Sequence, residues 1–452
     1  MGRASVKQKK GGVDILTTAI SAFVLTLAIG SYLIAHRKKS KEVERKITQA
    51  KERGLHEPVS IHPYIDPAKC IGSGACVKAC PEKDIIGLVD GKGKLIHASH
   101  CVGHGACAAA CPVGAITLVF GTETRGVDIP YVTPDYETNI KGVFIAGELG
   151  GMGLIKNAIT QGTKAVEYIA SQSSGKTRPD GVYDLIIVGA GPAGLGASLT
   201  AAKHKLKFVT IEQDDIGGAV LQYPRHKIVM TSPVDLPLYG KVKLKETTKE
   251  ALLELWMEVI RKTGIRINTQ EKMTGLQSTD GRFRVKTTRA QYLAERVVLA
   301  IGRRGTPRKL GVPGENMPKV AYKLLDPEQH RDTDLLVVGG GDSAIEAAML
   351  LSCLPGNRVT LSYRGAAFSR LKPLNKDRLE KTLSGKSLKV MLCSNVKEIR
   401  EKAVIMEANG RIAELPNEYI YIFAGGEMPN EFLNSIGVEI EKRFGKPTGI
   451  RT

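Results

Sequence analysis

An apolar stretch stands near the start of the chain. It runs from Val13 to Ala35 over 23 residues and contains Asp14 as its only charged residue. At a helical rise of about 1.5 Å per residue, this length spans a bilayer core of about 30 Å. A cleaved signal peptide is the alternative, but the stretch is long for one, and HRKKSK follows without a small-residue cleavage site. We predict a tail and single transmembrane anchor over residues 1–36, then a solvated basic linker helix over residues 37–59.

From Tyr183 the pattern becomes apolar strand, glycine turn and helix. Residues 185–188 are expected to form a buried parallel strand. The turn that follows holds the three glycines of G-x-G-x-x-G, namely Gly189, Gly191 and Gly194. Such glycines let the pyrophosphate of a dinucleotide approach the backbone at a helix N-terminus. Glu212 ends the next strand, FVTIE, where an acid accepts hydrogen bonds from ribose hydroxyls.

The same pattern returns from Asp334 and predicts a second dinucleotide unit. Its three motif places are taken by Gly339, Gly341 and Ala344. The next strand ends in Ser362 where an NAD site usually has an acid, and Arg364 and Arg370 follow. Two guanidinium groups without a carboxylate favour the 2′-phosphate of NADPH over NADH. The alternative is that both arginines are solvated surface charges.

Two cysteine runs provide candidate metal-binding residues, in addition to the two dinucleotide motifs. Residues 70–81 read CIGSGACVKACP and residues 101–112 read CVGHGACAAACP. Each has the spacing of the iron–sulfur run C-x2-C-x2-C-x3-C-P, but Ser73 and His104 replace the second cysteine. A zinc site is the less suitable reading, because the C-x3-C-P endings and the duplication follow cluster spacing.

Composition and charge narrow the classes of function. Six of eight cysteines lie in the runs, which argues against a secreted disulfide framework and for a reducing compartment. The isolated Cys353 and Cys393 have apolar neighbours, so we expect both to be buried packing residues. Residues 1–53 hold 12 Lys/Arg against 4 Asp/Glu, a large part of the net charge of +19. With a single Trp as well, nucleic-acid binding is not indicated, and the positive-inside rule places the redox domains on the cytoplasmic side of the cytoplasmic membrane.

Residues 183–452 resemble the thioredoxin-reductase-like flavoproteins, which have an FAD domain with an inserted NADPH domain. The marks are GAGPAG, LAIGRRGTPRKLGVPGE, GGGDSAIEAA and YIYIFAGGEMPN. Residues 60–120 resemble bacterial two-cluster ferredoxins. The resemblance implies an α/β fold class with two Rossmann-like domains (FAD and NADPH) and a small α+β ferredoxin-like domain, to which the apolar stretch adds one N-terminal transmembrane helix. The expected boundaries are 60–120 for the ferredoxin-like domain, 182–308 for the FAD domain, 309–418 for the NADPH domain and 419–452 for the return to the FAD domain.

The ferredoxin resemblance also implies the ligand sets, since the fourth cysteine of each run binds the other cluster. One cluster would be held by Cys70, Cys76 and Cys111, with Ser73 nearby. The other would be held by Cys101, Cys107 and Cys80, with His104 nearby. Three thiolates suit either a 3Fe-4S cluster or a 4Fe-4S cluster with a different fourth ligand. Ser73 and His104 would either bind iron themselves or leave the fourth position open.

The flavoprotein resemblance has two departures. Family members end with T-x-x-x-G-[VI]-F-x-A-G-[DE], whose acid contacts the flavin's ribityl chain, whereas here residues 138–168 match that segment, with Glu148 as the acid. We interpret residues 121–171 as the permuted closing segment of the FAD domain; a separate small domain is the alternative. The second departure is that the helix GGGDSAIEAAMLLSC lacks the C-x-x-C of thioredoxin reductases.

The predicted function is a membrane-anchored oxidoreductase that moves electrons between NADPH, FAD and two iron–sulfur clusters. Its partner would be an electron carrier of undefined class: a ferredoxin, a quinone, a cytochrome or a membrane subunit. A flavin reductase of small disulfides and a non-catalytic redox-sensing subunit are the alternatives. The membrane lipid is a second expected partner, and a homodimer is left open.

Overall fold

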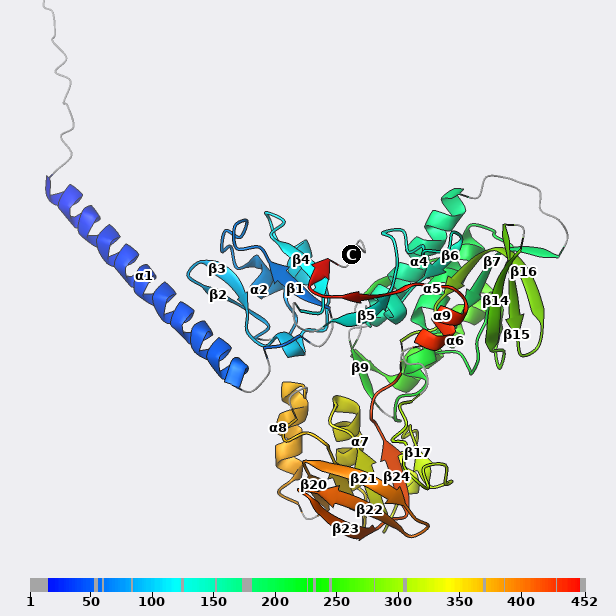
Figure 1. Ribbon diagram of the computed structural model, residues 1–452. Helices are drawn as coiled ribbons and strands as arrows, with labels where there is room; N and C mark the ends of the chain where they lie inside the picture. The colour runs from blue at the N-terminus through cyan, green and yellow to red at the C-terminus, as the bar shows by residue number, and fades with distance from the viewer. Residues whose placement is uncertain are drawn as a thin grey trace, which may run out of the picture.

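The computed structural model describes most of the chain (Figure 1). The described residues are 15–52, 56–58, 61–82, 84–122, 126–150, 153–172, 181–225, 227–230, 233–243, 246–279, 281–303, 307–368, 371–385, 387–427 and 429–447. Figure 1 shows one long helix beside a small unit that contains both cysteine runs (the two-run unit, residues 61–120), a large sheet at the right with helices between it and the two-run unit, and a lower α/β lobe.

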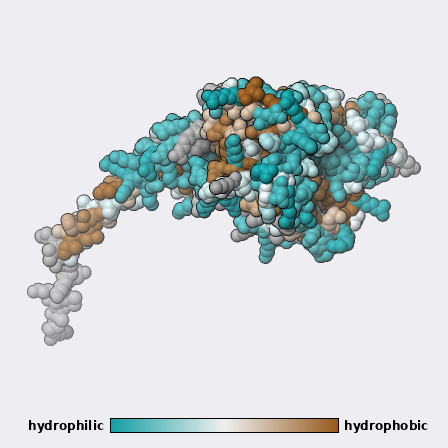
Figure 2. All heavy atoms as spheres, turned by 90° about the horizontal axis from the view of Figure 1, so that it is seen from below, coloured by the Kyte–Doolittle hydropathy of each residue, from teal (hydrophilic) through white to brown (hydrophobic). Residues whose placement is uncertain are grey.

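The N-terminal segment forms one continuous helix, α1 (Ile15–Glu52), of 38 residues. Its first half carries apolar side chains that no described part of the chain covers; Phe23 is 66% exposed. Figure 2 shows this apolar band along the helix, followed by a hydrophilic second half. Among the described residues, α1 is the one helix long and apolar enough to cross a membrane.

The second half of α1 differs from the expected solvated linker. One of its faces packs on the two-run unit, where Ser40 and Ala50 are buried. Lys46 forms an ion pair with Asp84 at 2.8 Å, and Val43 fills the space above Gly87. The sequence did not indicate this packed face, because the small and β-branched residues that form it are interspersed among charged residues.

The two-run unit is built from two short helices and two antiparallel strand pairs. β1 pairs with β4, and β2 and β3 form a hairpin. The bounds are β1 (Ile61–Ile65), α2 (Ala75–Ala79), β2 (Ile86–Val89), β3 (Lys92–Leu95), η1 (Ala98–His100), α3 (Ala106–Ala109) and β4 (Ile116–Phe120). Helices α2 and α3 each follow a left-handed glycine, Gly74 (φ +70°) and Gly105 (φ +79°), so the repeat in sequence is a repeat in backbone conformation.

The large sheet has the order β13-β8-β7-β16-β15-β14, and β6 adds to β16. Strands β6, β7, β8, β13 and β16 are parallel, whereas β14 and β15 form an antiparallel extension. The bounds are β6 (Val143–Ile145), β7 (Val182–Val188), β8 (Phe208–Ile211), β13 (Ile267–Asn268), β14 (Met273–Thr279), β15 (Arg282–Thr287) and β16 (Gln291–Leu299). Buried aliphatic residues of β6, β7 and β16 form its core.

Residues before the first glycine motif therefore lie in the same sheet as the residues after it. Val143, Phe144 and Ile145 of β6 pair in parallel register with residues 297–299 of β16. The next helix, α4 (Ile155–Gln172), packs on α5 (Pro192–Lys203), the helix that opens at the glycine motif. The contact is close: a Cβ on Gly162 would collide with the Ala193 carbonyl.

A smaller layer covers the far side of α5. It consists of α6 and two antiparallel pairs, β9 with β12 and β10 with β11. The bounds are η3 (Gly218–Val220), β9 (Ile228–Met230), β10 (Val234–Leu236), β11 (Gly240–Val242), β12 (Glu246–Thr248) and α6 (Lys249–Thr263). Thr248 caps α6 by accepting from the Ala251 N–H, and Trp256 is buried beneath it.

The lower lobe contains a five-stranded parallel sheet of order β17-β24-β18-β19-β20 and an antiparallel sheet, β21-β22-β23. The bounds are β17 (Val320–Ala321), η4 (Pro327–Gln329), β18 (Asp334–Val338), α7 (Asp342–Ser352), β19 (Arg358–Ser362), α8 (Pro373–Thr382), β20 (Leu388–Met391), β21 (Ser394–Ile399), β22 (Ala403–Ala408), β23 (Arg411–Pro416) and β24 (Tyr419–Ile422). Its parallel core agrees with the dinucleotide unit predicted from Asp334.

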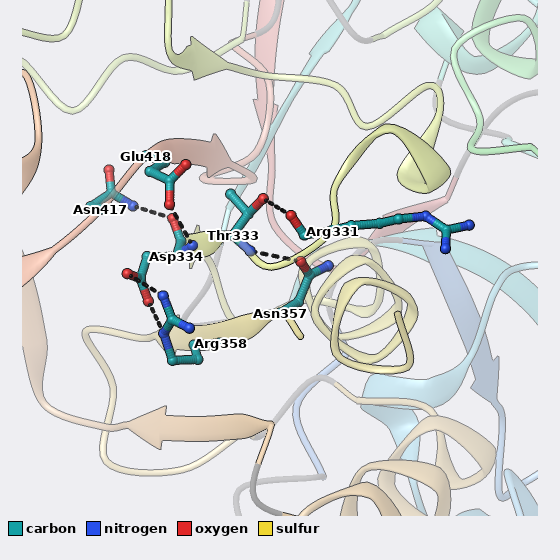
Figure 3. Close-up of polar contacts among 7 residues, drawn as sticks. All are labelled: Arg331, Thr333, Asp334, Asn357, Arg358, Asn417 and Glu418. Atoms are coloured by element: carbon teal, nitrogen blue, oxygen red, sulfur yellow. Dashed lines mark hydrogen bonds and ion pairs between the residues drawn. The ribbon is translucent and has the colours of Figure 1, made fainter. Parts of the chain in front are cut away.

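A polar network joins the amino ends of three of these strands (Figure 3). Arg358 at the start of β19 donates to both carboxylate oxygens of Asp334 at the start of β18, at 2.6 and 2.8 Å. Asn357 accepts from the Thr333 N–H, and Glu418 from the Asp334 N–H. This network lies at the edge of the parallel sheet opposite the second glycine turn. Its charges therefore stabilise the sheet and are too far from that turn to contact a nucleotide.

The end of the chain crosses back to the two-run unit. After α9 (Asn430–Ser435), β25 (Ile440–Arg443) pairs with β5 (Val127–Pro130), and β26 (Lys446–Pro447) adds a third strand beside β4. Residues 419–452 were expected to return to the FAD domain. Their first strand, β24, instead completes the lower lobe's sheet beside β18, whereas Leu433, Ile436 and Val438 then pack in the core of the large sheet. β26 also ties this end of the chain to the ferredoxin-like unit through backbone hydrogen bonds, a contact that no sequence motif predicts.

Candidate redox sites

The six clustered cysteines separate into two groups of three. Cys70, Cys76 and Cys111 line one cavity together with Ser73. Burial raises the pKa of Cys76, and the thiolates of Cys70 and Cys111 add to that rise, which places the three sulfurs close together. This group takes one cysteine from the second run, as the ferredoxin resemblance implies.

The second group is Cys80, Cys101 and Cys107. The pKa of Cys107 is raised to about 11, mainly by burial and in addition by the neighbouring thiolates of Cys101 and Cys80. This group is the complement of the first and takes Cys80 from the first run. The crossing of the two runs follows from the packing of α2 on α3.

Backbone N–H groups point at sulfur in the first group. The Gly93 N–H donates to Cys70 Sγ at 3.4 Å, and the Ala115 N–H donates to Cys111 Sγ at 3.2 Å. Such hydrogen bonds are among the features that set the potential of an iron–sulfur cluster. They also stabilise thiolate sulfur, the form that binds metal.

The two replaced positions differ in their surroundings. Ser73 is exposed, and its Oγ accepts from the Ala75 N–H at 3.5 Å. His104 is half-buried; burial is the main cause that lowers its pKa, Glu82 opposes the shift and Lys372 adds to it. A neutral imidazole is the form that can bind a metal.

These donors suit a cluster better than a single ion. Within the described ranges, no group of three or more His, Cys, Asp or Glu side chains is close enough to hold one metal ion. Each thiolate of an iron–sulfur cluster binds a different iron, so its ligands stand further apart than those of a tetrahedral zinc. Two separated trios of cysteine meet that condition.

The first glycine turn has the geometry that a dinucleotide requires. Gly189 has φ +107°, and a Cβ there would lie 2.5 Å from the Ala300 carbonyl oxygen. A Cβ on Gly194 would collide with the Gly189 carbonyl, so this glycine lets α5 pack on the turn. The nearest atom to a Cβ on Gly191 is 3.6 Å away, which leaves its outer face open to a ligand.

Two carboxylates flank this turn. Glu212 directly follows β8, and its carboxylate accepts from the Ala190 N–H at 2.7 Å and from the Asp214 N–H at 3.0 Å. Glu148 lies in η2 (Glu148–Gly150), after β6, at the same edge of the sheet. Near it is Arg303, whose pKa burial lowers while the carboxylates of Glu148 and Asp128 oppose the shift. Arg303 was not among the site residues predicted from the sequence, although it lies in the IGRR run.

The second glycine turn opens α7. Gly339 has φ +147°, and a Cβ on it would lie 2.6 Å from the Phe423 carbonyl oxygen. Gly341 has free space around it, and Ala344 is buried where α7 packs on the strands. The ring of Tyr363 covers Gly340 and stacks on Phe368 at 5.3 Å.

The residues expected to select NADPH follow β19. Ser362 is its last residue and is fully buried, with its Oγ 2.8 Å from Ser394 Oγ. No carboxylate therefore occupies that strand end. Arg364 is exposed directly beyond it, and Arg370 lies outside the described residues.

Cys353 and Cys393 are both exposed, so the expectation that they are buried packing residues was wrong. Cys353 is the C-cap of α7, where the helix has left the core. Cys393 lies in a turn after β20 with φ +48°. Apolar neighbours in sequence were misleading because both residues stand at the end of a buried element.

The ferredoxin-like unit also meets the lower lobe. His100 lies beside Asp342, the first residue of α7, and beside the Leu371 backbone. His104 lies beside Lys372. The second cysteine group is therefore on the side of the unit that faces the lobe with the second glycine turn. No local sequence pattern predicts this contact between distant segments.

Comparisons with known proteins agree with this architecture. A family model described as pyridine nucleotide-disulphide oxidoreductase matches residues 186–448, and one described as a 4Fe-4S dicluster domain matches residues 62–112. The second match covers both cysteine runs.

Individual relatives match the flavoprotein part. A thioredoxin reductase of Peptoclostridium acidaminophilum is 33% identical over 235 residues, 51% of this chain and 68% of the relative. A ferredoxin–NADP reductase of Ignicoccus hospitalis is 28% identical over 265 residues, 57% of this chain and 82% of the relative. The solved bacillithiol disulfide reductase Bdr of Bacillus cereus superposes with TM-score 0.53 at 27% identity, covering 59% of this chain and 85% of its own.

Proposed function

Because this chain belongs to the pyridine nucleotide-disulphide oxidoreductase family, we propose that it is a membrane-anchored enzyme that moves electrons between NADPH, FAD and two iron–sulfur clusters. Its relatives are flavin-dependent NAD(P)H oxidoreductases. The observation that carries the proposal is the separation of six cysteines into two groups of three, within a unit joined directly to the flavin-type sheet.

The covalent joint supports transfer between flavin and clusters within one chain. β4 ends the ferredoxin-like unit, and β5 and β6 then lead into the large sheet. A circular permutation accounts for this order, since β6, η2 and α4 occupy the places of a closing segment ahead of the glycine motif. β25 and β26 add a second connection between the same two parts.

Each cofactor has residues that fit it. The open face of Gly191, with Glu212 and Glu148 at the same edge, suits FAD, and Arg364 beside the neutral Ser362 suits the 2′-phosphate of NADPH. When bound, FAD supplies the conversion of a hydride into two single electrons, which iron–sulfur clusters require. The residues of the chain position the nucleotides and surround the clusters, so no acid–base side chain is needed for a substrate.

Membrane anchoring rests on α1. Its apolar half is uncovered, while its second half is built into the ferredoxin-like unit through Ser40 and Ala50. A signal sequence would be cut away from the folded protein, whereas this helix continues without a break into a packed face. The basic residues after the apolar half favour a cytoplasmic position for the redox domains.

A reductase of small disulfides is the second candidate. It is favoured by the likeness to a bacillithiol disulfide reductase. The exposed Cys353 and Cys393 lie at the ends of different elements, α7 and β20, so the disulfide would have to meet the flavin without a protein dithiol.

Anaerobic titration with NADPH separates these functions. Loss of the flavin's visible band followed by reduction of the clusters supports electron transfer through the chain. Reduction of the flavin without reduction of the clusters, followed by reoxidation of the flavin by a small disulfide, supports a reductase of small disulfides. A flavin that NADPH does not reduce contradicts both and favours a redox-sensing role.

A further inference from the structure

The β2–β3 hairpin is fixed to α1 close to the end of the apolar half. Ser40 Oγ accepts from the Asp90 N–H at 3.0 Å and lies 3.3 Å from the Asp90 carboxylate. Ser40 comes five residues after Ala35, the last residue of the apolar stretch. At the helical rise, this is about 8 Å along the axis. If α1 spans the bilayer, the Asp90–Gly91 turn lies at the membrane surface.

The same turn contacts the first cysteine loop. A Cβ on Gly72 would collide with the Gly91 carbonyl, so the two backbones touch. Lys92 Nζ donates to the Cys70 carbonyl at 2.6 Å, and the Gly93 N–H donates to Cys70 Sγ. Residues 70–74 are therefore held on the β2–β3 hairpin, the part of the unit that lies next to α1 (Figure 1).

The surface of this loop is apolar. Ile71 is 65% exposed and Val113 is 41% exposed, and both line the cavity of Cys70, Cys76 and Cys111. An apolar side chain exposed to this extent beside a transmembrane helix is suited to the headgroup and acyl-chain boundary.

The second cysteine group lies on the side of the unit that faces the lower lobe. Cys101 directly follows His100, which lies beside the Leu371 backbone and Asp342 of the lower lobe, and Cys107 and Cys80 belong to the same group as Cys101. The two groups therefore have different neighbours: one the nucleotide-binding lobe, the other the membrane surface. A water-soluble partner would have to approach the first group through lipid headgroups.

We infer that the first cluster exchanges electrons with a carrier dissolved in the bilayer, of the lipid-soluble quinone class, with Ile71 and Val113 forming the contact surface. This inference rests on the proposed function and names its partner. In balanced form, NADPH, one proton and the quinone give NADP+ and the quinol. Two electrons leave the nicotinamide as a hydride, travel singly through the chain and reach the quinone with two protons.

The position of the loop of residues 70–74 relative to the membrane can be tested by a measurement that does not depend on enzyme activity. The full chain carrying Ile71→Trp is placed in vesicles containing brominated phospholipid, and its added fluorescence is compared with that in ordinary vesicles. The native Trp256 is buried and supplies a constant background. The matched control is Ile412→Trp, at a position 73% exposed in β23 of the lower lobe.

The inference expects at least twofold quenching of the tryptophan at position 71 and none at position 412. Val113→Trp repeats the measurement if the first variant loses its cluster absorbance. Equal fluorescence of position 71 in both kinds of vesicle would overturn the inference.

The partner is tested with native protein in vesicles containing a long-chain quinone. NADPH-dependent formation of quinol without any other protein supports the inference. Reduction of a water-soluble one-electron acceptor without quinol formation overturns it and leaves the proposed function intact. Quinol that forms only after addition of a second membrane protein also overturns it. Failure with both acceptors contradicts the proposed function itself, and the inference with it.

Discussion

Val143 pairs in parallel register with Val297, so a strand that precedes the first glycine motif completes the sheet that follows it. The ferredoxin-like unit lies directly before that strand. Electron-transfer centres and flavin site are thereby held in one covalent framework, and damage at the joint should affect both flavin binding and the delivery of electrons.

Gly162→Ala tests the joint. A Cβ at this position collides with the Ala193 carbonyl at the start of α5. We expect a loss of about 1–3 kcal/mol in the free energy of unfolding and a lower FAD content, because α4 must move away from the glycine turn. Gly275→Ala is the matched control, since free space surrounds it. Equal FAD content and stability of the two variants would show that the α4–α5 contact is unimportant.

The two cysteine groups predict which variants resemble each other. Cys80→Ser and Cys107→Ser come from different runs but should remove the same cluster signal in electron paramagnetic resonance. Cys70→Ser should remove the other signal. Cys353→Ser, at an exposed position outside both groups, should remove neither. If Cys80→Ser instead shares its loss with Cys70→Ser, each cluster is bound within one run and the crossed assignment is wrong.

His104→Cys tests whether this histidine binds iron. Replacing a neutral imidazole with an anionic thiolate should lower the cluster's potential, by on the order of 100 mV if His104 is a ligand. The measurement is a redox titration followed by paramagnetic resonance, with Ser73→Cys as the companion variant in the first run. An unchanged potential with an unchanged signal would mean that the position at residue 104 takes no ligand.

Arg364→Ala tests nucleotide selection. Loss of one charge-assisted contact to the 2′-phosphate should raise the KM for NADPH about tenfold. The KM for NADH serves as the internal control and should stay within about twofold, since NADH lacks the phosphate. A parallel rise for both nucleotides would assign Arg364 to general binding or to the stability of the lobe.

Local patterns explain what the sequence could predict. Gly189 and Gly339 each need a backbone conformation that other residues rarely adopt, and both glycines occur where a strand turns into a helix. The cysteine spacing places short helices after Gly74 and Gly105. In each case the constraint lies within a few residues of the chain, so it is visible without the fold.

Contacts between distant segments were not predictable. Arg303 lies near Glu148 because β6 and β16 are neighbours in the large sheet, and Lys372 lies near His104 because separate lobes meet. The covered face of α1 depends in the same way on Ser40 meeting Asp90. Cys353 shows the opposite error, because apolar neighbours suggested burial at a helix end that faces solvent.

Rapid freeze-quench paramagnetic resonance of the anaerobic protein after mixing with NADPH tests the central claim most directly. The account predicts that two reduced-cluster signals appear within the turnover time, and that one of them is absent in Cys107→Ser. Clusters that dithionite reduces but NADPH does not, although the flavin is reduced, would contradict it.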